Sequence, residues 1–439
     1  MISVNGIEQT EALVRVEGAK SAKLLENCQK GKYVFTDLSS LAEFISGIKL
    51  EDRAAIDVEN GLILFPRGEA VKKVLVTYSY AFSGNYGGGA YVRKEIKTLP
   101  EDNFWTATVS QSAPPRNHSG KKRHFKSLTA AIRAWSKSGC NGNILIQDNR
   151  SYSLPKDGLS ITVPGSRRLV VQSKAGAAPC IIGDMKINGG STGSTLVLGG
   201  LWIRGQLNVE GAMSLQVTDC TIQALHSSGR ASKRRSALIF SGGPFSSLSI
   251  DIKRSITGPI KITGNIVTCY ITDCIVDGYG GLAMRIRRQD KTVNVHNVCF
   301  FQTTFLGQVD LVRLIEATNV IFSKRVIVED RDSGYGRISS LAAGSETPSR
   351  YRCVTSVLSG EDSKNKGDAR LEFTSQVYGQ PGYAQLGLNT SKVISDGGEN
   401  GSEIGAFNLL MNTVRYKCLK NAVESYVPFG LTTDIVIKT

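Results

Sequence analysis

Apolar residues recur through the middle of the chain in short runs, each broken by a small or polar residue. The runs are rich in Val, Ile, Leu and Thr, residues that favour the half-buried surface of a β-sheet. Between Leu196 and Phe322 the small or polar positions are Gly200, Asp219, Arg254, Asp273, Asn297 and Asn319. Their intervals are about 19, 35, 19, 24 and 22 residues, a period typical of a solenoid. We therefore take these residues as the corners of stacked coils, with a loop at His226 to Ser236 inserted in the long interval.

This period predicts a mainly β protein built as a right-handed single-stranded parallel β-helix. About 20 residues are too few for a pair of packed helices, and the leucine frame of leucine-rich repeats is missing. Coils stack about 4.8 Å apart, so roughly nine coils over residues 143–329 would form a rod about 45 Å long. The positions expected in its core include Val217, Ile222, Ile252, Ile271, Ile275, Val295 and Ile321.

Both ends of such a stack are exposed strand edges that need a cover. Apolar residues at helical spacing precede the first coil, and Gly139 follows them, which predicts an N-terminal cap helix. These residues are Phe125, Leu128, Ile132 and Trp135. A second amphipathic helix is predicted after the last coil, either as the C-terminal cap or as part of a separate module. Its apolar residues are Ile404, Phe407, Met411, Val414, Cys418 and Ala422.

The pattern divides the chain into five regions. Residues 1–100 are predicted to form a small β or α+β domain, the candidate attachment region, and residues 101–124 a basic linker. The cap helix and the β-helix occupy residues 125–335. The repeat then fades, so we expect an irregular connection over residues 336–372 and a C-terminal, helix-containing module over residues 373–439.

Composition is that of an ordinary globular protein, with 439 residues of which 41% are hydrophobic. The sequence has no apolar run long enough to span a bilayer, and its first residues lack the basic and apolar regions of a secretion signal. We therefore expect cytoplasmic assembly without a signal peptide or a transmembrane segment. Nine cysteines without paired metal-ligand spacing are read as reduced, structural thiols.

The formal net charge of +15 is the stronger signal, and it gathers at residues 116–126, 230–235 and 285–288. Such runs are either solvated loops or a surface for an acidic partner, including an anionic membrane or envelope. Nucleic acid is disfavoured because no single-strand-binding module or zinc finger accompanies the basic runs. The glycine-rich stretch 83–90 lacks the Lys-Ser/Thr of a phosphate loop and is read as a contact loop with tyrosine anchors. The candidate interface residues are Tyr86, Gly87, Gly88, Gly89, Tyr91, Arg230, Lys233, Arg234, Arg235, Arg285, Arg287 and Arg288.

Catalytic chemistry finds little support in the sequence. A glycosidase needs two carboxylates about 5 to 10 Å apart, and Asp219 and Asp273 occupy equivalent corners, but the coil between them carries Arg254. Asp251 and Asp277 belong to neighbouring coils without the motifs of pectinase-like hydrolases. The four histidines do not converge, and there is no nucleophile elbow or dinucleotide fingerprint. The prediction is a non-enzymatic protein without catalytic, cofactor-binding or metal sites.

Several segments together resemble one protein family. They are Val74 to Ser83, Tyr86 to Tyr91, Arg254 to Ile260, Asp273 to Asp277 and, most specifically, Phe373 to Leu386, Glu399 to Phe407 and Tyr426 to Leu431. The sequences of these segments are similar to those of β-helix phage-tail or baseplate-associated proteins of phage-tail-like contractile injection systems. The resemblance covers residues 54–439, and the first 50 residues do not match.

The resemblance implies a structural component of a contractile particle, at or around the baseplate. Its partners would be other baseplate or tail subunits, with multiple copies in each particle. A rival interpretation is a tailspike-like β-helix that binds or cleaves anionic polysaccharide.

Overall fold

The computed structural model describes residues 84–97, 104–111, 123–224, 235–242, 247–287, 295–361 and 367–427, with five short strands before them. The chain divides into two units, Met1–Ala81 and Phe82–Thr439. In the first unit, β1 (Arg15–Val16) pairs antiparallel with β5 (Val74–Leu75). The strands β2 (Tyr33–Phe35), β3 (Ala54–Asp57) and β4 (Leu62–Leu64) form a second small sheet.

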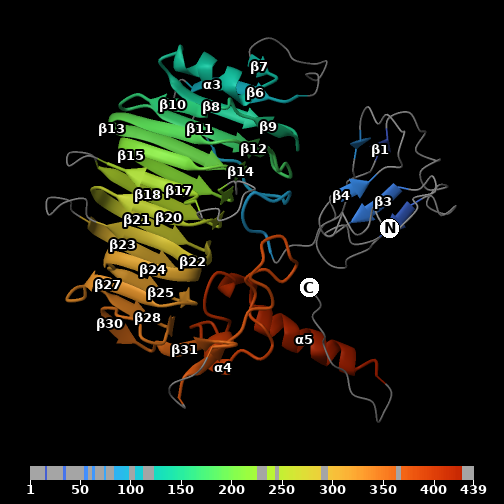
Figure 1. The fold of residues 1–439 in the computed structure, drawn as a ribbon, viewed down its shortest axis with the longest axis vertical. Helices are drawn as coiled ribbons and strands as arrows, with labels where there is room; N and C mark the ends of the chain where they lie inside the picture. The colour runs from blue at the N-terminus through green and yellow to red at the C-terminus, as the bar shows by residue number, and fades with distance from the viewer. Residues whose placement is uncertain are drawn as a thin grey trace. The chain divides into compact units, whose positions relative to one another are not determined.

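The second unit is dominated by one large sheet, in which 27 strands are found among the described residues and pair in parallel (Figure 1). With each coil the chain returns to the same three ladders, which we call faces A, B and C. Four long strands turn from one face to another: β13 (Met185–Gly199) and β15 (Leu207–Thr218) run from face C to face A, and β22 (Ile275–Arg287) and β24 (Thr304–Arg313) from face B to face C.

The shorter strands each belong to one face. Face A holds β6 (Phe104–Val109), β7 (Arg123–Phe125), β8 (Asn141–Ile146), β11 (Arg168–Ser173), β18 (Leu248–Lys253), β21 (Ile266–Thr272), β23 (Val295–Phe301), β25 (Glu316–Thr318), β28 (Tyr335–Arg337) and β30 (Ser349–Tyr351). Face B holds β9 (Ser151–Ser153), β12 (Cys180–Ile182), β14 (Trp202–Arg204), β16 (Thr221–Gln223), β19 (Ile256–Thr257), β26 (Ile321–Phe322), β29 (Ser340–Ala342), β31 (Val354–Leu358) and β32 (Ala369–Leu371). Face C holds β10 (Leu159–Val163), β17 (Leu238–Ser241), β20 (Ile260–Thr263) and β27 (Val326–Asp330).

The core lies inside the coils, where side chains of equivalent strand positions stack on one another. All seven positions expected in the core are buried. In the interior, the ring of Phe305 lies 4.9 Å from that of Phe300 and stacks on Phe322 at 5.1 Å between centroids. Ile275 and Ile321 differ from the other five, because they belong to separate apolar clusters outside this core. Burial was therefore predicted for the right residues, but two of them are covered from outside.

From β13 onward, each corner between face A and face B contains one residue in the left-handed backbone region. Gly200, Asp219, Arg254, Asp273 and Asn319 have φ between 43° and 67°, as predicted for corners. Asn297 is a wrong assignment, because it lies inside β23 and the corner of its coil is Gln302, with φ 46°. The backbone N–H of each corner donates to the residue before the next corner, for example Asp219 to the Lys253 carbonyl at 3.1 Å. The corners therefore continue the ladders around the bend.

The two ends of the stack differ. The predicted cap helix is α3 (Leu128–Ser136), which buries Leu128, Ile132 and Trp135 and begins at Ser127, whose hydroxyl accepts from Ala130 N–H at 3.1 Å. The predicted second helix is wrong in its extent and its packing. Its first part is a compact loop with a 3₁₀ turn, η1 (Asn408–Leu410), and α5 (Asn412–Glu424) buries only Asn412. α5 is therefore not a cap.

The predicted region boundaries need two further corrections. The expected linker 101–124 contains β6, which pairs with β8 in face A. The expected irregular connection 336–372 contains β29, β30, β31 and β32, so the coils continue to Leu371. The sequence pattern does not reveal this extension, because these strands are three to five residues long and their corners, Ile338 and Arg352, are not typical left-handed residues.

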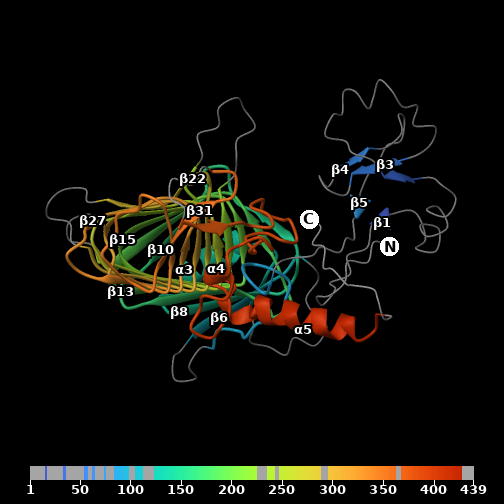
Figure 2. The ribbon, with the colours of Figure 1, turned by 90° about the horizontal axis from the view of Figure 1, so that it is seen from below.

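The C-terminal module follows β32 and contains α4 (Lys392–Ser395), η1 and α5. Figure 2 views the stack from below and shows this orange-to-red module and the blue segment before β6 on one side of the coils. In the described part of the chain, no helix is both long and apolar enough to cross a membrane. The eight cysteines found there are unpaired, and most of them are buried, in line with structural thiols.

Candidate functional site: a buried charge cluster at the coil corners

The outer surface of face B carries a buried column of side chains. Thr221, Ile256, Ile275, Thr304 and Ile321 follow one another in register across the coils, and each is at most 2% exposed. Outward-facing isoleucines stay dry only under a cover. Two segments distant in sequence supply it: residues 84–97, which we call the anchoring segment, and residues 373–411 of the C-terminal module.

Both segments reach this column through the same backbone device. Gly88 N–H donates to Thr221 Oγ1 at 3.0 Å, and Ala406 N–H donates to Thr304 Oγ1 at 3.0 Å. The preceding glycine in each segment, Gly87 or Gly405, donates to the carbonyl of a corner residue. Both glycines have positive φ, and a Cβ on either would lie within 2.6 Å of the threonine hydroxyl, so only glycine fits.

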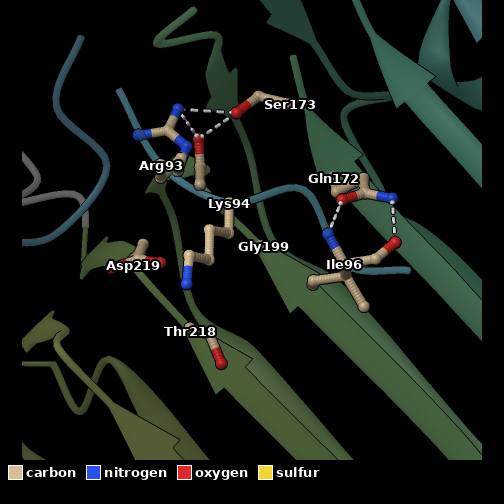
Figure 3. Close-up of a pocket in the computed structure, with 9 residues that line it drawn as sticks. Arg93, Lys94, Ile96, Gln172, Ser173, Gly199, Thr218 and Asp219 are labelled. Atoms are coloured by element: carbon tan, nitrogen blue, oxygen red, sulfur yellow. Dashed lines mark hydrogen bonds between the residues drawn. The ribbon is translucent and has the colours of Figure 1, made fainter. Parts of the chain in front are cut away.

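The anchoring segment continues along the corners toward the N-terminal coils. Arg93 donates to Gly89 O at 2.6 Å, to Ser173 Oγ at 2.6 Å and to the carbonyls of Ala177 and Gly200. Ile96 and the Gln172 side chain exchange two hydrogen bonds, as Figure 3 shows. The hollow between these residues is about 10 Å³, the space of a single water molecule. This hollow is therefore too small for an organic substrate.

The anchoring segment and the C-terminal module meet at Tyr86. Its hydroxyl donates to the carbonyl of Ala406, and its ring lies 5.1 Å from that of Phe407 in an edge-to-face arrangement. Further along the module, the fully buried Tyr383 donates to Asp277 Oδ2 at 2.9 Å. Residues of the segments Phe373 to Leu386 and Glu399 to Phe407 therefore take part in the cover of face B.

Titratable groups gather beneath this junction in what we call the corner cluster: Tyr86, Tyr91, Asp219, Arg254, Asp273 and Glu403. Arg254 binds Asp219 with two hydrogen bonds, Nε to Oδ1 at 2.8 Å and Nη2 to Oδ2 at 2.9 Å. Tyr91 adds a third donor to Asp219 Oδ1 at 3.0 Å. The Asp219 side chain is only 6% exposed, so this bidentate partner compensates a carboxylate that has lost its water.

Asp273 occupies the next corner and is less well compensated. Its Oδ1 is buried and has no hydrogen-bond partner among the described residues. Burial raises the pKa of the Asp273 carboxyl to about 6, although the nearby Arg254 charge opposes the rise. Because the Arg254 guanidinium is already engaged by Asp219, one cation serves two carboxylates.

Glu403 supplies a third buried carboxyl from the C-terminal module. Its Oε1 accepts from Asn412 Nδ2 at 3.1 Å, and its main-chain carbonyl accepts from Asn408 Nδ2 at 2.7 Å. Burial raises the pKa of Glu403 to about 7, and the hydrogen bond from Asn412 opposes the rise. Burial also raises the pKa of Tyr86 and Tyr91, so both phenols stay protonated.

The four aspartates that sequence analysis considered for a hydrolase have different surroundings. Asp277 lies under Tyr383, and Asp251 pairs with Lys253 at 2.8 Å on face A. Asp219 is bound by Arg254, and Asp273 is 9% exposed next to Tyr86. The corner cluster therefore holds segments together with charges, and it does not present a pair of carboxyl groups to solvent. Among the described residues no group of three or more metal-ligating side chains converges.

The predicted interface residues fall into three groups. Tyr86, Gly87 and Gly88 are buried in contacts within the chain, and Gly89 and Tyr91 are half-buried there, so these residues do not form a free contact loop. Three of the predicted basic residues lie in the described part of the chain, on the side of face C. Arg235 pairs with Asp184 at 2.7 Å, and Arg285 and Arg287 both face Asp310, at 3.0 and 3.6 Å. Arg230, Lys233, Arg234 and Arg288 lie outside the described residues.

Glu403, Arg93 and Thr304 belong to this site but were not singled out from the sequence. Asp219, Arg254 and Asp273 were identified as corners, yet nothing in the repeat shows which segment covers them. Comparison with models of known protein families finds no match to the chain, and comparison with curated proteins finds none either.

Proposed function

We propose that the chain is a non-enzymatic structural subunit of a phage-tail-like contractile injection particle, at or around its baseplate. In this proposal the coils form a right-handed, single-stranded parallel β-helix that serves as a rigid body. Other subunits of the particle bind to elements that extend from the β-helix, among them α5. The family resemblance of the C-terminal segments motivates the assignment, and the exposed surface of α5 carries it.

α5 leaves the C-terminal module with apolar side chains uncovered. Its start is held by Asn412 on Glu403 and by Thr413 on Ser395, but from Cys418 onward every residue of the helix is exposed. Leu419, Val423 and Tyr426 follow at helical spacing and are 48%, 39% and 89% exposed. A helix of 13 residues that buries only its first residue, Asn412, is marginal in water. A neighbouring subunit that packs on these apolar side chains explains both the length of α5 and the apolar composition of this face.

The test is particle association of a tagged full-length chain in the cells that encode it. We expect the protein to cosediment with assembled contractile particles, and Leu419→Glu with Val423→Glu to abolish cosedimentation while leaving the melting temperature unchanged. Asn421→Glu, on the same exposed helix, is the matched control and should remain bound. Absence of the wild-type chain from purified particles would contradict the proposal.

A second candidate function is binding or cleavage of anionic polysaccharide, and one surface favours it. Face A exposes Tyr270, Tyr335 and Tyr351, at 37%, 41% and 60%, and Arg337 lies beside Tyr351 in register. Exposed tyrosines beside a guanidinium on a flat sheet can stack on sugars and pair with their acidic groups.

Incubation with anionic polysaccharides separates the two functions. Release of new reducing or unsaturated ends, lost when Asp251, Asp273 or Asp277 is changed to Asn, would replace the structural proposal by an enzymatic one. Binding without cleavage, lost in Tyr335→Ala and Tyr351→Ala, would add a receptor-binding role to the structural subunit.

A further inference from the structure

The corner cluster joins three parts of the molecule that are far apart in sequence. Tyr86 belongs to the anchoring segment, Asp273 to a corner of the coil stack, and Glu403 to the C-terminal module. The Tyr86 phenol lies within electrostatic range of both carboxyl groups, and Tyr416 of α5 lies within range of Glu403. Arg254 is the one cation close to Asp273 in the described part of the chain, and it is bound to Asp219.

We infer that this junction is a proton-dependent clasp: protonated Asp273 and Glu403 hold the anchoring segment and the C-terminal module on face B, and ionisation of the two carboxyl groups loosens both. This inference does not depend on the proposed function. It rests on the arrangement of buried groups: Asp219 and Asp273 share the Arg254 guanidinium, and Glu403 accepts a hydrogen bond from the Asn412 amide.

The physical reason is the imbalance between charge and compensation. Asp219 receives three hydrogen bonds from Arg254 and Tyr91, which compensate its burial. Asp273 has an oxygen without a donor, and Glu403 has Asn412 as its side-chain donor, so both are stable in the buried state mainly as neutral acids. When the pH rises and the two carboxyl groups ionise, opening of the junction hydrates each carboxylate. The free energy gained by this hydration exceeds the free energy lost with the contacts.

The groups facing the two acids do not offset this effect. Asp273 faces Arg254 and Tyr86, with the Cys274 thiol beside it, and Glu403 faces Asn412, Tyr86 and Tyr416. Burial raises the pKa of Tyr86 and Tyr416, and it raises that of Cys274 above its usual range. These groups therefore stay neutral when Asp273 and Glu403 ionise, and they supply no new positive charge.

Hydrogen exchange of the full chain, read by mass spectrometry at about pH 5.5 and about pH 8 and corrected for the intrinsic exchange rate, tests the clasp. We expect peptides from residues 84–97 and 399–411 to lose protection on the order of tenfold at the higher pH. Peptides from β21 in the coil interior should not change. Glu403→Gln keeps an acceptor for Asn412 and should remove most of the change in the C-terminal peptide, and Asp273→Asn should reduce it in the anchoring segment.

Glu399→Gln is the matched control, because Glu399 lies in the same module but pairs with Arg337 at the surface. It should retain the full pH dependence. Equal protection at both pH values in the wild type would overturn the inference. Unchanged pH dependence in both amide variants would overturn it as well. Each variant is a single isosteric change and is expected to fold, and its thermal melt verifies this.

Discussion

The hydroxyl of Tyr86 donates a hydrogen bond to the carbonyl of Ala406 across 320 positions of the sequence. This contact joins the segment that enters the coil stack to the module that leaves it. Both are held on the same column of face B, because the backbone N–H groups of Gly88 and Ala406 donate to the hydroxyls of Thr221 and Thr304. Face B of the stack is therefore covered by the chain's own flanking segments.

Removing this contact should weaken the cover without disturbing the coils. Tyr86→Phe keeps the ring against Phe407 but leaves the Ala406 carbonyl without its donor, and we expect a loss of about 1 to 2 kcal/mol in the free energy of unfolding. Tyr86→Ala also creates a cavity and should cost about 3 to 5 kcal/mol. Denaturant titration measures both, with Val92→Ala, at a 74% exposed position of the same segment, as the control. Equal stability of all three variants would show that the segment is not docked.

The phase of the strands is tested within β21. Ile271 is fully buried and Val267 is 40% exposed on the same strand. Ile271→Asp places an unpaired carboxylate in the core and should cost several kcal/mol. Val267→Asp should change stability by less than about 0.5 kcal/mol. Thermal melts of the two variants compare them directly, and a reversed order of stability would place the strand in the opposite register.

The free energy of unfolding should depend on pH through Glu403. Its pKa is about 7 in the folded chain against an ordinary value of 4.5, so the folded state holds the proton more tightly. Stability is therefore greatest below pH 4.5 and falls as the pH rises to 7, by about 3 kcal/mol for this group alone. Comparing denaturant titrations of the wild type and Glu403→Gln across this range isolates the contribution. If the stability of the wild type changed with pH by the same amount as that of Glu403→Gln, this prediction would be contradicted.

The boundary between the two units gives a fourth prediction. Deletion of residues 1–81 removes one unit and leaves the anchoring segment in place, so the melting temperature of the coils should not change. Deletion of residues 1–97 also removes Tyr86, Tyr91 and Arg93 and exposes the isoleucines of face B. We expect that chain to melt several degrees lower and to bind a hydrophobic dye. Identical melting of the two deletions would assign the anchoring segment no stabilising role.

The coil architecture was accessible from the sequence because its signal repeats. Asp219, Arg254 and Asp273 each follow an apolar strand, and Asp219 and Asp273 each lie 19 residues after the preceding corner. An error at one corner, Asn297 for Gln302, does not disturb the others. The cap helix was equally clear, because Leu128, Ile132 and Trp135 fall on one helical face. These features depend on neighbours in sequence or on equivalent positions in successive coils.

The cover of face B was not accessible, because it depends on contacts without a period. Ile275 and Ile321 look like interior residues, since an outward isoleucine under a distant segment has the same pattern as an inward one. Tyr86 and Gly87 have the composition of a partner-binding loop, and the partner is the chain itself. Glu403 gives no signal in the sequence, because its burial follows from the fold of a loop between α4 and η1.

The corner geometry has a consequence for how long such a molecule can become. Gly200 to Asp219, Arg254 to Asp273 and Asn319 to Ile338 are each 19 residues apart, and each corner repeats the same backbone conformation and the same hydrogen bond to the following coil. A unit of this length can be gained or lost without altering α3 at one end or the C-terminal module at the other. Each such step changes the length of the coil stack by about 4.8 Å. The distance between its two ends can therefore be adjusted in evolution in fixed increments.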